Sequence, residues 1–250
     1  MWPGVKAGAS RRWANLVAWE GSRPRRRSKA KAFQDRLPWM GPLIFGLSVL
    51  YFAVQIFVSL VWRPSYSWSR NSISDLGNTS CSTTLCSPRH GWMNVEFFAL
   101  GFVMAAGSLL IFQEFTERDA DERLAALLGF SGLAVGGVGA ALVGRFPENT
   151  VHAMHILGAA LAIGVGTAGI FVLGLALSLP QGRYLRLGMR VVPPIAVTAL
   201  ILFACHVYLG IGAGTMERLA AYPETVWMIV FGTYIAWDHH LKARPSTRGV

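Results

Sequence analysis

The sequence predicts an all-α membrane protein, a bundle of six transmembrane helices with both chain termini in the cytoplasm. Of its 250 residues, 53% are apolar and only 14% are charged, which is unlike an ordinary soluble domain. Six stretches are long and apolar enough to cross about 30 Å of hydrocarbon, for which a helix needs about 20 residues. They lack the alternation of a membrane β-strand, so each span is expected to be helical.

The six predicted spans are joined by connections too short to hold a second domain. Their ranges are 39–62, 92–113, 124–144, 151–179, 191–213 and 223–241. The predicted organisation is therefore a basic, disordered cytoplasmic tail over 1–38, a transmembrane domain over 39–241 and a short cytoplasmic tail over 242–250. Pro193 and Pro194 are expected near the start of the fifth span, where a missing N–H group costs least.

The distribution of Lys and Arg predicts the orientation. With the N-terminus inside, the cytoplasmic segments carry 18 basic residues and the outer loops carry 5, as the positive-inside rule requires. The run RPRRRSKAK at 23–31 is expected to bind anionic lipid of the inner leaflet. No sequence signature of nucleic-acid recognition accompanies this run, so a nucleic-acid partner is not expected. The Arg-rich composition is typical of a GC-rich bacterial genome, which predicts a multi-pass protein of the bacterial plasma membrane.

Small residues recur every four positions in the third and fourth spans. Such stripes let two helix backbones approach closely inside a membrane. We therefore expect these two spans to pack together as a hairpin, and the alternative is self-association of two chains through the same glycines. The residues are Gly132, Gly136 and Ala140 in one span and Gly158, Ala162 and Gly166 in the other.

Two of the three cysteines lie five residues apart in the longest outer loop. In an oxidising outer compartment, Cys81 and Cys86 are expected to form a disulfide. The alternative is a reduced pair without a structural role.

Most ionisable residues in or beside the predicted spans fall at the outer end. Because a charge near hydrocarbon is costly, such residues usually face a bundle interior and mark a site. At the inner end the sequence offers mainly Asp238, His239 and His240. The outer set is Asp75, Glu96, Arg145, Glu148, His152, His155, His206, Glu217, Arg218 and Glu224.

Three kinds of chemistry fit the outer set. His152 and His155 have a spacing that places two imidazoles on one helix face, where they could hold a divalent metal with Asp75, His90 or Glu96. Carboxyl and imidazole groups could instead carry out metal-free acid–base chemistry. The third alternative is structural, with Arg145 and Arg218 forming ion pairs to Glu148, Glu217 or Glu224.

Four motifs in order give the chain a resemblance to a known family. They are SISDLG, SPRHGWMN, GRFPEN followed by H-x-x-G-A at His155 to Ala159, and GTMERLAAYP. These segments resemble the bacterial and archaeal membrane family called domain of unknown function 998, over about Trp39 to Leu241. The resemblance implies six spans and polar family positions at Ser74, Asp75, Pro147, His155, Glu217, Arg218 and Tyr222. The ISDLG segment is also distantly similar to the family of damage-regulated autophagy modulators and a GPI-lipid remodelling factor.

Position and resemblance together select the candidate site residues Asp75, His155, Glu217 and Arg218, and Glu96 is added for its depth in the second span. The predicted function is binding or modification of a lipid in a polar cavity at the extracytoplasmic end, with a hydrolase or acyl-transfer reaction as the enzymatic form. The alternative is a noncatalytic scaffold or partner-binding subunit held together by outer ion pairs. A proton-coupled transporter is less expected, because the inner halves of the spans lack ionisable residues.

Overall fold

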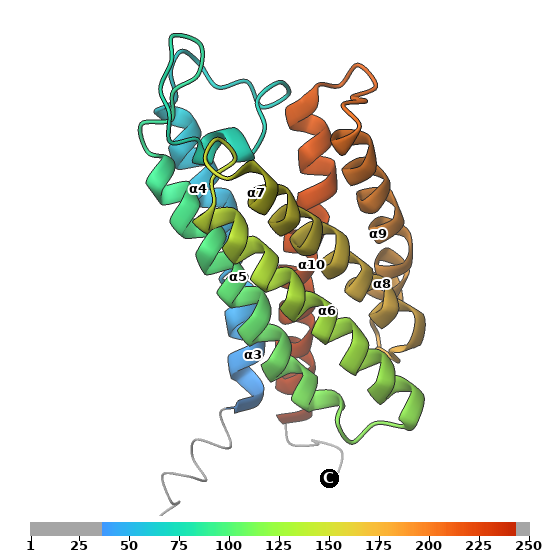
Figure 1. The fold of residues 1–250 in the computed structure, drawn as a ribbon. Coiled ribbons are helices and arrows are strands. Elements are labelled where there is room, and N and C mark those ends of the chain that lie inside the picture. The colour runs from blue at the N-terminus through green and yellow to red at the C-terminus, as the bar shows by residue number, and fades with distance from the viewer. Residues whose placement is uncertain (1–36, 244–250) are drawn as a thin grey trace, which may run out of the picture. The chain divides into compact units, whose positions relative to one another are not determined.

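Residues 37–243 are described by the computed structural model, and they fold into helices joined by short links and one long loop (Figure 1). Nearly all of both predicted tails, including the basic run, lies outside these residues. The α-helices are α3 (Leu37–Gly46), α4 (Val49–Leu60), α5 (His90–Phe112), α6 (Ala120–Arg145), α7 (His152–Ala159), α8 (Gly166–Ala176), α9 (Arg183–Ala204) and α10 (Ala213–Ala243). Two 3₁₀ turns, η1 (Ser74–Gly77) and η2 (Gln113–Phe115), and a π-helical segment, η3 (Ala160–Val165), complete the order.

The predicted all-helical fold is confirmed, and no strand occurs in residues 37–243. Five helical stretches are long and apolar enough to cross a membrane. They are Pro38–Leu60, His90–Phe115, Ala120–Arg145, His152–Ala176 and Arg183–Ala204. The sixth predicted span lies within α10, which is not one of these five. Large apolar side chains such as Leu60, Val95 and Phe102 are exposed on the helix surfaces, as expected of helices that face lipid.

The helices pack in chain order and the last returns to the first. α5 lies between α3 and α6, α6 contacts α8, and α9 lies between α8 and α10. α10 then packs on α3, which closes the ring (Figure 1). We call the end of the bundle at which residues 61–89 lie the loop end, and the opposite end, where the chain enters α3 and leaves α10, the tail end.

The predicted glycine hairpin is confirmed. A Cβ atom at Gly139 would lie 2.5 Å from both the Ala162 nitrogen and the Gly158 oxygen, and one at Gly136 would lie 3.1 Å from the Gly166 Cα. The backbones of α6 and of the α7–η3–α8 column are therefore in direct contact, which only glycine permits at these positions.

The opposite face of α6 packs equally closely on α5. A Cβ atom at Gly137 would collide with the Gly101 carbonyl oxygen, and one at Gly144 would collide with the Asn94 carbonyl oxygen. Small residues on two faces thus place α6 between both of its neighbours within one chain.

The fifth and sixth predicted spans are displaced along the chain. α9 starts at Arg183 and ends at Ala204, whereas 191–213 was expected, and α10 starts ten residues before the predicted residue 223. Pro193 and Pro194 therefore lie inside α9 and not at its start. Helices in a membrane tolerate internal proline. The Thr198 hydroxyl donates to the Pro194 carbonyl oxygen one turn earlier at 2.8 Å, as threonine often does inside a helix.

The long loop folds back onto the loop end of the bundle. Ile73 and Leu76 are buried, and the Ser87 hydroxyl donates to the Leu76 carbonyl at 2.7 Å. Cys81 and Cys86 form the predicted disulfide. Hydrophobic anchoring, hydrogen bonds and a covalent link thus hold this loop.

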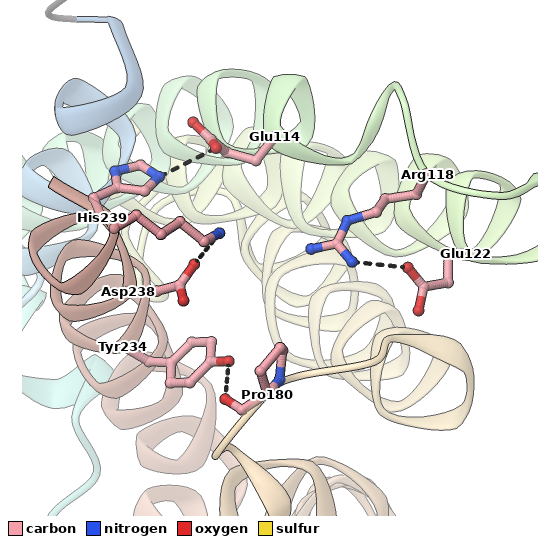
Figure 2. Close-up of polar contacts among 8 residues, drawn as sticks. Glu114, Arg118, Glu122, Pro180, Tyr234, Asp238 and His239 are labelled. Carbon is pink, nitrogen blue, oxygen red and sulfur yellow. Dashed lines mark hydrogen bonds and ion pairs between the residues drawn. The ribbon is translucent and has the colours of Figure 1, made fainter. Parts of the chain in front are cut away.

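The tail end is joined by polar contacts (Figure 2). Glu114 accepts from His239 at 3.1 Å, which links α10 to the end of α5, and the Tyr234 hydroxyl donates to the Pro180 carbonyl at 2.6 Å. Further ion pairs are Arg118–Glu122 and Lys242–Asp238. All ion pairs found within residues 37–243 are therefore at the tail end, whereas the sequence pattern indicated the loop end.

Gly139→Ala is expected to destabilise the bundle, because its methyl group would meet the backbone of the next helix. The expected loss is about 1–3 kcal/mol of unfolding free energy, measured by thermal unfolding in lipid nanodiscs. Gly188→Ala is the matched control, since a Cβ atom there meets nothing within 4 Å and alanine favours a helix. An equal loss in both variants would show that the close packing at Gly139 is not limiting.

Candidate functional site

Glu217 lies near the start of α10 and binds the long loop. The sequence pattern placed this residue in a connection, but α10 begins at Ala213 and includes it. The carboxylate accepts hydrogen bonds from the Ile73 N–H, from the Ser74 N–H at 3.3 Å and from the Ser74 hydroxyl at 2.8 Å. A side chain of a distant helix thus satisfies the backbone donors at the beginning of η1, a position that usually needs a local cap.

His155 contacts the same serine from the opposite helix. Its Nε2 lies 3.0 Å from the Ser74 hydroxyl oxygen, and its Nδ1 lies 3.0 Å from the Phe146 carbonyl oxygen. A carbonyl oxygen can only accept, so Nδ1 carries a proton and Nε2 faces Ser74. We call Glu217, Ser74 and His155 the Ser74 relay.

Counting protons shows that the relay has two neutral arrangements. If Glu217 is protonated, it donates to the Ser74 oxygen, and Ser74 in turn donates to a neutral His155 at Nε2. If Glu217 is ionised, Ser74 donates to Glu217, and His155 must be doubly protonated to donate to Ser74. The two arrangements differ by the net transfer of one proton from carboxyl to imidazole through the serine hydroxyl.

The relay lies in the wall of a cavity of about 550 Å³ at the loop end. We call it the loop-end cavity. Its polar side includes Arg70, Asp75, Glu148, His152 and His206, in addition to the relay. Its apolar side is formed by α7, η3 and α9, through residues Ile156, Ala159, Ala160, Ile163, Leu200, Ile201 and Phe203. The cavity is thus polar near the loop and apolar where it passes between the α7–η3 segment and α9.

The acidic and basic groups of the cavity are not paired with each other. Burial, and then the neighbouring Asp75 carboxylate, raise the pKa of Glu148 above its ordinary value. His206 contacts the Tyr208 hydroxyl at 2.9 Å. The side chains of Arg70 and His152 make no hydrogen bond to any residue of 37–243, so both remain available to an anionic ligand.

A known protein family matches the part of the chain that contains this site. The family described as "Protein of unknown function (DUF998)" matches residues 47–234, a range that includes all three relay residues. The chain belongs to this family. No curated protein and no solved structure matches it.

Arg218 of this DUF998 protein holds the loop and does not form the expected ion pair. Its guanidinium donates to the carbonyl oxygens of Trp68, Asn71 and Gly214 at 2.8, 3.0 and 2.8 Å. It also donates a hydrogen bond to the hydroxyl of Tyr66. The central carbon of the guanidinium, Cζ, lies 4.7 Å from the centre of the Trp68 ring. Arg218 is therefore a clamp between α10 and the loop.

The other predicted ion pairs at the loop end are also absent within residues 37–243. Arg145 is exposed and lies over the Phe146 ring, whereas Glu224 is buried deep in α10 without a cationic partner. Glu224 forms no ion pair at the loop end because α10 starts early, at Ala213, which places Glu224 eleven residues into the helix.

Asp75 lines the cavity but has a local structural role. Its carboxylate accepts from the Ser72 N–H at 2.9 Å, and the Ser72 hydroxyl accepts from the Asp75 N–H at 2.9 Å. This reciprocal pair resembles a capping box and shapes the turn that presents Ser74.

The structure does not bring Glu96 together with the relay residues. Glu96 is half-buried on α5, it does not line the loop-end cavity, and it makes no hydrogen bond or ion pair within residues 37–243. Depth alone selected it, and depth does not specify which face of a helix a residue occupies.

The metal alternative based on His152 and His155 does not fit the geometry. Both ring nitrogens of His155 are engaged, with Ser74 and with Phe146. In the described part of the chain, no group of three or more His, Cys, Asp or Glu side chains is placed to hold a metal ion.

Ser74 joins this site but was not selected as a candidate, although the resemblance named it. A serine in an SISDLG turn is explained equally well by capping. Only the folded structure distinguishes this serine, because its partners His155 and Glu217 lie 81 and 143 residues away in the sequence.

Arg218→Lys is expected to lower stability by at least about 2 kcal/mol, because an ammonium cannot bond several buried carbonyls in the fork geometry of a guanidinium. Limited proteolysis of residues 61–89 should accelerate. Arg145→Lys, at an exposed position of the same end, should leave both unchanged. A charge exchange, Glu217→Arg with Arg218→Glu, should restore nothing, and recovery in that double variant would contradict the clamp and indicate an ion pair.

Proposed function

We propose that this DUF998 protein binds a membrane lipid in the loop-end cavity and that Ser74 attacks an acyl ester of that lipid. The observation that carries the proposal is the Ser74 hydroxyl in the cavity wall, 3.0 Å from an imidazole whose other nitrogen is fixed by a carbonyl. A serine, a base and a group that orients the base are the parts of an activated nucleophile.

The shape of the cavity suits an amphipathic ligand. The polar side would hold a headgroup, and the apolar side between α7 and α9 would hold the beginning of an acyl chain. Arg70 and His152 are the available donors for a phosphate or for the oxyanion of an ester under attack. The distant similarity of ISDLG to a lipid-remodelling family agrees with a lipid ligand.

The reaction balances within the relay. The Ser74 oxygen bonds to the ester carbonyl carbon while its proton passes to His155 Nε2. The ester C–O bond breaks, and the leaving alcohol takes that proton. Water, or the hydroxyl of a second lipid, then attacks the acyl-serine and gives its proton to His155. His155 returns this proton to the Ser74 oxygen as the acid or the new ester is released.

Orientation and span number form part of the proposal. Six spans with both termini in the cytoplasm of a plasma-membrane protein place the loop end outside. Two observations support this orientation. One is the excess of basic residues in the sequence segments expected inside, and the other is the Cys81–Cys86 disulfide at the loop end, since disulfides persist in oxidising compartments.

A noncatalytic scaffold is the second candidate. The bonds of Arg218 and Glu217 to the loop favour it, because both residues also act as structural ties. The scaffold predicts that every change at the relay acts through stability alone, whereas the enzyme predicts loss of reaction in folded protein.

Ser74→Ala and His155→Gln are each expected to lower ester turnover about 10²–10⁴-fold, the usual contribution of a nucleophile or base. Purified protein in nanodiscs of bacterial lipid would be analysed by mass spectrometry for released fatty acid and lysolipid. Labelling of Ser74 by a fluorophosphonate probe would report the nucleophile directly. Ser82→Ala, at an exposed position of the same loop, is the control. Unchanged turnover and labelling in both relay variants would overturn the proposal.

Glu217→Gln is expected to change the pH dependence of fluorophosphonate labelling. In the wild type, loss of the Glu217 proton at rising pH turns the Ser74 hydroxyl away from His155, so labelling should fall on the alkaline side. An uncharged amide cannot lose this proton, so the variant should keep its labelling there. If the variant and the wild type lose labelling over the same pH range, Glu217 does not control the serine proton.

A further inference from the structure

A second recess lies on the side of the bundle, and none of the three relay residues lines it. This lateral groove of about 500 Å³ is bordered by α8, α9 and α10. Its residues on α10 run from Thr215 to Val230, about 22 Å along a helix that rises 1.5 Å per residue. Nearly all of its lining is apolar, and residues at its edge such as Leu219 and Val226 are about half exposed. A groove of this form suits a hydrocarbon chain.

Three buried polar atoms interrupt the apolar lining. Glu224 Oε1, Thr167 Oγ1 and Trp227 Nε1 each lack a hydrogen-bond partner, and all three residues line the groove. Their side chains belong to residues that are only 4%, 1% and 7% exposed. Buried polar groups without partners are rare, and each requires an explanation.

The three atoms belong to one region of the groove. Glu224 and Trp227 are three residues apart and therefore share a face of α10. The Glu224 carboxyl packs so closely on Gly166 that any side chain at that position would collide with it. Thr167 is the next residue of α8. The three residues therefore come from neighbouring positions of α8 and α10 in the groove wall.

The bonding capacity of these atoms identifies the ligand group. Trp227 Nε1 can only donate, Thr167 Oγ1 can donate or accept, and the unpaired Glu224 carboxyl oxygen can accept. A hydroxyl donates one hydrogen bond and accepts two, which matches this set. A fatty-acid carboxylate would bring an unpaired charge into an apolar groove, an ammonium could not accept from Trp227, and a plain hydrocarbon would leave all three atoms unpaired.

We propose that the lateral groove binds a lipid alcohol, a long-chain molecule whose free hydroxyl bonds Glu224, Thr167 and Trp227. This site does not depend on the chemistry of the Ser74 relay, and Ser74→Ala should leave it intact. The chain of the lipid alcohol would lie along the apolar part of the groove between α9 and α10.

Blocking the groove is the first test. The full-length protein in nanodiscs would be photolabelled with a 1,2-diacylglycerol that carries a diazirine in one chain, and labelled peptides would be identified by mass spectrometry. Gly188 lines the groove, and neither Gly188 nor Gly46 has an atom within 4 Å of an added Cβ. Gly188→Phe should remove at least about nine-tenths of the labelling on α8–α10, an effect of more than 1.4 kcal/mol if labelling follows binding. Gly46→Phe, on α3, should leave it unchanged.

Removing a single polar atom is the second test. Thr167→Val keeps the side-chain shape and deletes one donor, so it should weaken labelling about three- to tenfold. Because the Thr167 hydroxyl has no hydrogen-bond partner in the protein, this variant should not lower the thermal stability of lipid-free protein. A purely structural role would instead appear as lost stability.

The probe supplies its own control. A diacylglycerol whose hydroxyl is converted to a methyl ether should label α8–α10 at most one-tenth as strongly. Equal labelling by both probes, unchanged labelling in Gly188→Phe, or an equal loss in Gly46→Phe would each overturn the proposal. Persistence of the groove labelling in Ser74→Ala, together with loss of ester turnover, would separate this site from the relay.

Discussion

Polar groups in the interior of this bundle have only other protein groups to bond with, and this constraint explains most of the architecture. At the tail end, Glu114 and Glu122 each find a partner on another segment. At the loop end, Glu217 and Arg218 bond the backbone of a loop that has little regular structure of its own. Exceptions such as Glu224 Oε1 are therefore informative, because burial of a polar atom without a partner costs free energy.

The Ser74 relay joins segments that are remote in sequence. His155 brings the α6–α7 connection and α7 to η1, while Glu217 brings α10 to the same turn. The groups that position the serine are thus the groups that hold the loop, so structural and chemical roles coincide at this end. Such a site is held by helices and not by a mobile loop, which favours fixed geometry for proton transfer.

The sequence predicted features that depend on local pattern. Apolar length identified the helices, the four-residue glycine spacing identified the α6 hairpin, and the positions of Cys81 and Cys86 identified the disulfide. Features that depend on tertiary neighbours were beyond it. α9 contains Pro193 and Pro194 in its interior, and α10 begins ten residues early, where Glu217 and the loop stabilise its first turns. Asp75 and Ser74 are both typical turn residues, and only the approach of distant helices distinguishes the nucleophile candidate from the cap.

The π-helical segment η3 has a consequence for comparing this chain with others of its family. A π turn closes over five residues where an α turn closes over four, so η3 accommodates additional chain between His155 and Gly166. His155 must face Ser74, and Gly166 must face both α6 and Glu224. A relative with regular α-helix in place of η3 could keep both residues on these faces only if it had one residue fewer between them. A single-residue gap between these two positions in an alignment would then mark a change of helix type, with the two contact faces preserved.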